Sequence, residues 1–67
     1  MTIGEYTRKA KQLLEEASIP SAQLDAEILL ADTLNKDRSW IIAHADDELP
    51  LQGPSLQRLD EQVRRRV

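Results

Sequence analysis

The side chains most suited to chemistry lie between positions 39 and 48, around His44, the only histidine of the chain. Nucleophilic catalysis needs a hydroxyl that faces a base. Ser39 lies five residues before His44, a spacing that does not bring two side chains onto one helical face. The acids Asp46, Asp47 and Glu48 lack the spacing and the glycine turn of a calcium-binding loop. We therefore expect a solvated acidic loop here, without a catalytic dyad or a metal site.

Cofactor chemistry finds no support elsewhere in the chain. The only glycines are Gly4 and Gly53, so no glycine-rich loop is present to hold a phosphate or a nucleotide. There is no cysteine for a disulfide or a thiolate metal site. A chain of 67 residues forms one domain at most. We expect this chain to bind no cofactor and to have no catalytic activity by itself.

The charge and the hydropathy of the chain argue against nucleic acid and membrane partners. The net charge is −3, with an acidic segment at residues 18–35 and a mildly basic one at 49–67. Extensive phosphate contacts require a dense basic face. No apolar run approaches the roughly 18 residues of a membrane span, and no signal-peptide pattern is present. We expect a soluble, cytoplasmic, monomeric protein.

Apolar residues recur at the helical period along most of the chain. This pattern predicts a single domain over 1–67, an all-α compact bundle of four to five short helices. The expected helices span 3–17, 22–34, 38–43 and 54–67, and a further turn is expected around 50–52. Thr2 with Glu5 forms a capping-box pattern. Ser21 and Asp37 are expected N-caps, and Asn35 is an expected left-handed C-terminal residue.

The segment 22–34 carries the broadest apolar arc, which predicts a central helix with Ile28 near the middle of the core. Trp40 is predicted to pack in the core, turned inward together with Ile41. The alternative is a partner-facing anchor, because tryptophan is enriched at binding hot spots.

The last helix is expected to continue past Val67, because its apolar spacing holds to the final residue without a stop signal. It ends in three arginines, Arg64 to Arg66. One reading leaves them solvated at the helix end. The other pairs at least one of them with Asp25 or Glu27 of the segment 22–34.

The order of several short motifs resembles one family across nearly the whole chain. These motifs are Ile19-Pro20-Ser21, Leu24-Asp25-Ala26-Glu27-Ile28-Leu29-Leu30-Ala31, Arg38-Ser39-Trp40-Ile41-Ile42-Ala43-His44 and Leu56-Gln57-Arg58-Leu59 with Arg65-Arg66. Together they are similar to the N-terminal helical domain of the release-factor glutamine methyltransferases. The stretch 49–55 departs from the family pattern, and Leu51-Gln52-Gly53-Pro54 looks like a small insertion.

The resemblance implies a substrate-docking domain that helps present the Gly-Gly-Gln loop of a peptide chain release factor. In that family a following domain uses S-adenosylmethionine to methylate the glutamine at N5. That domain's cofactor loop and its Asn-Pro-Pro-Tyr motif have no counterpart in this chain, so no catalytic or cofactor residue is carried over.

The expected partner is the release factor, met by surfaces that the bundle leaves uncovered. The candidate partner-binding residues are Arg8, Lys11, Gln12, Glu15, Asp46, Asp47 and Glu48. A different class of function also fits the sequence, a stand-alone helical module for protein interaction or self-association. A helix-turn-helix nucleic-acid binder is less favoured, because the segment 22–34 is acidic.

Overall fold

The computed structural model describes residues 1–66 and confirms the all-α fold. It contains four helices, α1 (Ile3–Glu16), α2 (Ala22–Leu34), α3 (Arg38–Ala43) and α4 (Pro54–Arg66). The described part of the chain has no strand, only an isolated bridge between Thr2 and Glu48. Val67, and with it the expectation that the last helix continues, lies outside the described residues.

The ends of the helices follow from local side chains. The Thr2 hydroxyl accepts from the Glu5 backbone N–H, and the Glu5 carboxylate accepts from the Thr2 backbone N–H, so the expected capping box is present. Asp37 accepts from the Trp40 N–H at 2.8 Å and begins α3. Asn35 ends α2 in the left-handed conformation, with φ of 57°. These three expectations are confirmed, and α1 ends one residue earlier than predicted, at Glu16.

The N-cap role expected for Ser21 is only partly realised. Ser21 occupies the position before α2, but its side chain bonds no backbone N–H. Its ψ is 35°, and this non-extended backbone does not aim the hydroxyl at the first turn in the way an N-cap does. The hydroxyl instead donates to the Asp25 carboxylate at 3.2 Å.

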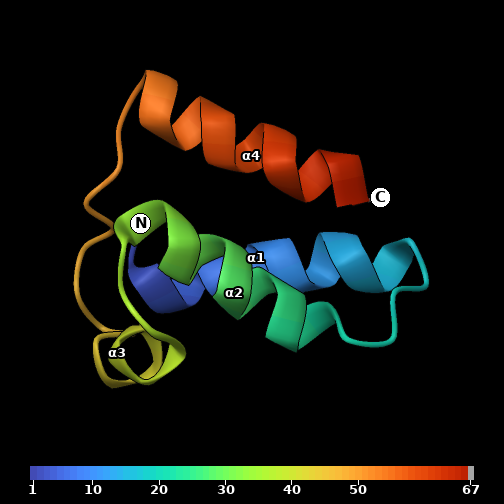
Figure 1. Cartoon of the computed structure of the whole chain (residues 1–67), viewed down its shortest axis with the longest axis horizontal. Helices are drawn as coiled ribbons and strands as arrows, with labels where there is room; N and C mark the ends of the chain where they lie inside the picture. The colour runs from blue at the N-terminus through green and yellow to red at the C-terminus, as the bar shows by residue number, and fades with distance from the viewer. Residues whose placement is uncertain (67) are drawn as a thin grey trace.

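The four helices share one core. α1 and α2 lie side by side, α4 packs against both of them, and α3 packs against both near the start of the chain (Figure 1). In the described residues α3 and α4 do not contact each other. The side chains that are most completely buried come from all four helices and are Ile3, Leu14, Leu30, Ile41, Leu59 and Val63.

The prediction that Ile28 lies near the centre of the core is wrong. Ile28 is only half-buried, whereas Leu30 is 0% exposed and Ala26, one turn earlier, is 2% exposed. Because α1, α3 and α4 all contact α2, its buried face is set by where those neighbours lie. The apolar arc of α2 is wider than the surface that they cover, and Leu24 remains 40% exposed at its edge.

The segment between α3 and α4 is held against the N-terminus by backbone hydrogen bonds. The N–H groups of Ile3 and Gly4 donate to the carbonyls of Asp47 and Ala45, and the Leu49 N–H donates to the Met1 carbonyl. A Cβ at Gly4 would lie 3.0 Å from the Ala45 carbonyl oxygen, so a larger residue here would have to push this segment outward by a few tenths of an ångström. The turn expected around 50–52 does not form, since the chain runs on without helical structure toward α4.

Candidate functional site

A groove of about 330 Å³ opens between α1, α2 and α3. Arg8 and Lys11, one turn apart on α1, form part of its lining. Ile41 and Ile42 of α3 supply an apolar wall, and α2 contributes the carboxylate of Glu27. The groove therefore combines two cations, an apolar wall and a carboxylate, a mixture that suits a ligand with both charged and apolar parts.

Glu27 is a buried charged residue, with 4% of its surface exposed. Its Oε1 accepts from two guanidinium nitrogens of Arg38, Nη2 at 2.8 Å and Nε at 3.3 Å. This pair ties α2 to the start of α3 and offsets the cost of burying the carboxylate. Sequence reasoning did not single out this role, although an acid between Ala26 and Ile28 in an apolar arc is a signal for a buried ion pair.

The predicted partner-binding residues of α1 fall into two groups. Arg8 and Lys11 line the groove. Gln12 is exposed and does not line this groove, while Glu15 lies with Lys11 beside a polar hollow at the turn between α1 and α2. The structure thus brings the two cations to one site and leaves the other two side chains outside it.

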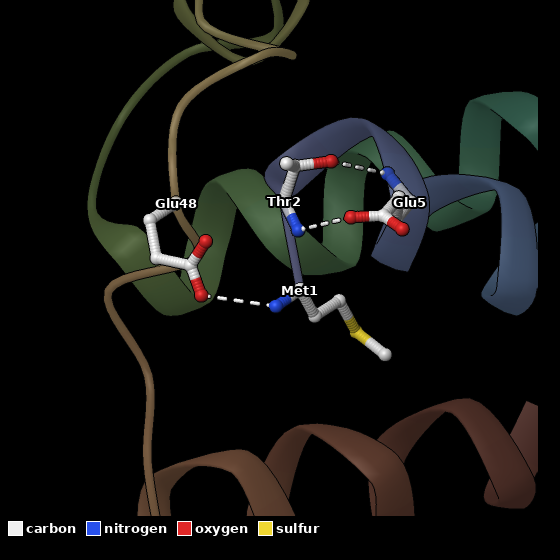
Figure 2. A network of polar contacts seen from close by, with 4 residues as sticks. All are labelled: Met1, Thr2, Glu5 and Glu48. Atoms are coloured by element: carbon white, nitrogen blue, oxygen red, sulfur yellow. Dashed lines mark hydrogen bonds and ion pairs between the residues drawn. The ribbon is translucent and has the colours of Figure 1, made fainter.

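Part of the acidic loop, which was predicted as a partner surface, binds the N-terminus of the chain itself. The Met1 amino group donates to the Glu48 carboxylate at 2.9 Å, beside the Thr2–Glu5 capping box (Figure 2). Asp46 and Asp47 are exposed in the same loop. All three acids are therefore exposed, and Glu48, whose side chain is 77% exposed, also holds the N-terminus of the chain.

Three pKa shifts accompany these contacts. Hydrogen bonding to Glu48, helped by its charge, raises the pKa of the Met1 amino group above 8.0. Hydrogen bonds from Thr2 lower the pKa of Glu5 below 4.5. Burial, followed by a hydrogen bond to Asp60, raises the pKa of the Tyr6 phenol. The Tyr6 hydroxyl donates to Asp60 at 2.5 Å and so connects α1 with α4.

Between pH 8 and pH 10, the free energy of unfolding is expected to fall as the pH rises. The folded chain keeps the Met1 proton longer than the unfolded chain, whose amino pKa is 8.0, so this contribution is complete below pH 8 and is lost above it. Tyr6 adds a similar loss only above its ordinary pKa of 10.0. Denaturant melts at several pH values measure the slope, after mass spectrometry has shown that Met1 is retained. Glu48→Gln should flatten the slope, and an unchanged slope in that variant would contradict this assignment.

One arginine of the last helix does pair with α2. Arg66 Nη1 lies 3.7 Å from the Asp25 carboxylate, as in the second of the two readings of the arginine run, whereas Arg64 and Arg65 are exposed, as in the first. The Arg66 side chain is 43% exposed. An ion pair exposed to this degree contributes about 0–1 kcal/mol to the free energy of unfolding.

Trp40 lies at the edge of the core and not inside it. It is half-buried and packs against the core cluster, whereas Ile41 is 2% exposed, so only Ile41 is fully turned inward as predicted. The Trp40 ring stacks on His44 with 4.1 Å between centroids, and the Lys36 ammonium lies 5.3 Å from the indole. His44 Nδ1 is 2.8 Å from the Trp40 carbonyl oxygen. The only histidine of the chain is therefore held by the last turn of its own helix.

Within residues 1–66, no three acidic or histidine side chains converge in a way that would hold a metal ion. None of the helices in the same region is long and apolar enough to cross a membrane. The described residues thus form a small all-α domain with an open, mixed groove on one side.

Comparison with known families identifies this kind of domain. The model of the PrmC N-terminal domain family matches residues 5–67. The chain belongs to this family, the N-terminal domains of release factor glutamine methyltransferases.

Two curated relatives agree with the family match. The release factor glutamine methyltransferase of Koribacter versatilis (strain Ellin345) is 36% identical over 66 residues, which cover 98% of this chain and 23% of the relative. The protein of the same name from Leptospira interrogans serogroup Icterohaemorrhagiae serovar Lai (strain 56601) is 58% identical over 31 residues, 46% of this chain and 11% of that protein. The chain thus spans less than a quarter of the relatives' length. No solved structure matches it.

Proposed function

We propose that this chain is the substrate-docking domain of a release factor glutamine methyltransferase. It binds a peptide chain release factor and helps present the Gly-Gly-Gln loop for N5-methylation by a catalytic domain that uses S-adenosylmethionine. The observation that carries the proposal is the family match over residues 5–67. The open groove with two cations and an exposed isoleucine gives the domain a surface suited to a protein partner.

The proposal includes a monomeric enzyme in the cytoplasm that makes no direct contact with nucleic acid. The net charge of −3 supports this part, because phosphate-backbone binding is carried by excess positive charge. A self-associating module would instead bury the groove against a second copy of the chain. Sedimentation of the full-length enzyme measures its oligomeric state and so distinguishes the two.

Deleting residues 1–67 from the full-length enzyme is expected to lower kcat/KM for intact release factor by roughly tenfold or more, since docking energy remote from the reacting group supports the transition state. A short peptide that contains the Gly-Gly-Gln sequence serves as the control substrate. The deletion should change its kcat/KM little, which shows that the catalytic domain is still folded. An unchanged kcat/KM for the intact release factor would overturn the docking function.

A further inference from the structure

We propose that the groove between α1, α2 and α3 holds a segment of the protein substrate that presents an acidic side chain next to an apolar one. This assignment, which rests on the proposed docking function, places the acidic side chain at Arg8 and Lys11. It places the apolar side chain against Ile42. The backbone of the bound segment then runs over Glu27.

The first step is the charge of the groove. No ion pair joins Arg8 or Lys11 to a carboxylate within residues 1–66. Glu5, one turn before Arg8, directs its carboxylate to the Thr2 N–H at 2.8 Å. The charged residues that line the groove are Arg8, Lys11 and Glu27, a net +1 on a protein of net charge −3, and the Glu27 carboxylate is already paired with Arg38. A local positive patch on an acidic protein selects an acidic partner and speeds its encounter.

The second step is the apolar wall. Ile42 is 58% exposed, the most exposed of the large aliphatic side chains of the described core helices, while its neighbour Ile41 is buried. Both residues line the groove. An exposed isoleucine beside cations gains by being covered with an apolar side chain of a partner, as in the centre of a protein interface.

The third step is the carboxylate in the groove. Both hydrogen bonds to Glu27 end at Oε1. No buried side-chain oxygen within the described residues lacks a hydrogen-bond partner. The Oε2 atom is therefore not completely enclosed, and Glu27, whose side chain is 6% exposed, is one of the residues that line the groove. An acceptor at this place suits a backbone N–H of a bound segment, which favours a polypeptide over a simple anion.

The test uses the full-length enzyme and intact release factor. The double variant R8E/K11E should raise KM by roughly tenfold and leave kcat unchanged, since these charges act on encounter and docking. The control K9E/R58E changes the net charge equally at two exposed positions outside the groove, and should change KM less than about twofold.

Raising the salt concentration should raise the KM of the wild type more than that of R8E/K11E.

A second pair of variants tests the apolar wall without a change of charge. Ile42→Asn should raise KM severalfold, whereas Leu24→Asn, at the other exposed large aliphatic residue of α2 and α3, should leave KM near the wild-type value. Thermal melts of each variant show whether the domain remains folded, which is expected because Leu24 is 40% and Ile42 58% exposed.

The outcomes separate the groove from the docking function. If R8E/K11E and Ile42→Asn behave like their controls while deletion of residues 1–67 still lowers kcat/KM, docking stands and the groove assignment is wrong. If the deletion itself has no effect, both proposals fail. A fall in kcat without a rise in KM would show that these side chains act on the chemical step and not on docking. A dimer that R8E/K11E dissociates would show that a second copy occupies the groove. Either result overturns the proposed occupant.

Discussion

Leu30→Ala is expected to lower the free energy of unfolding of this domain by about 2–5 kcal/mol. Leu30 is 0% exposed and belongs to α2, the helix that α1, α3 and α4 all contact. Removing its side chain deletes buried apolar surface and leaves a cavity where several elements meet, which the rigid surroundings fill only in part. A loss of this size is a large fraction of the total stability of so small a domain, and denaturant melts of the 67-residue chain measure it.

Two substitutions on the same helix serve as graded controls. Leu24→Ala removes a side chain of the same type that is 40% exposed, and should cost about 0.5 kcal/mol or less. Ile28→Ala, at a half-buried position, should cost about 1–2 kcal/mol. The order Leu30, Ile28, Leu24 is the expected ranking. A larger cost at Ile28 than at Leu30 would show that the core is centred elsewhere on α2.

Arg38→Ala is expected to cost about 1–3 kcal/mol, although Arg38 lies at the surface. The substitution leaves the Glu27 carboxylate, which is only 4% exposed, without its two hydrogen bonds. Breaking a buried pair on one side is more damaging than removing both charges, because the remaining charge stays desolvated. The expected cost is smaller than for a fully buried ion pair, because the Arg38 side chain is 48% exposed. Water can therefore replace part of its interaction with Glu27.

The double variant Glu27→Met/Arg38→Met separates this explanation from loss of packing. If the cost of Arg38→Ala comes from an unpaired carboxylate, the double variant should be close to the wild type in stability. Arg58→Ala, at an exposed arginine of α4 without an ion pair in the described residues, controls for the loss of any surface arginine. A double variant less stable than Arg38→Ala would rule out the explanation.

Local patterns were sufficient to predict the helices and most of their ends. Thr2 with Glu5, Asp37 and Asn35 each act on backbone groups within a few residues, so their effect does not depend on the rest of the fold. Ser21 shows the limit of such patterns, since its hydroxyl bonds the Asp25 carboxylate and not the backbone. Serine is a suitable N-cap residue, but the backbone angles after Pro20 keep its hydroxyl away from the N–H groups of the first turn.

The order of motifs also pointed to the family, which the match over residues 5–67 confirms. Local motifs did not predict which of the candidate partner residues lie together in one site. Arg8 and Lys11 meet Glu27 because α1 packs on α2, and they meet Ile42 because α3 packs across both helices. Glu48 was predicted as a partner residue and is joined to the Met1 amino group, a contact across nearly the whole chain.

The sequence by itself determined the all-α class and most of the helix boundaries, because periodicity and capping act over a few residues, and the order of its motifs pointed to the family. The tertiary structure alone decided which part of the broad apolar arc of α2 is buried, placing Leu30 inside and Ile28 at the edge. It also decided that Glu27 is buried against Arg38 and that a positive groove forms beside them. Each of these depends on how helices from distant parts of the chain pack, and the spacing of residues within one helix carries no information about its neighbours.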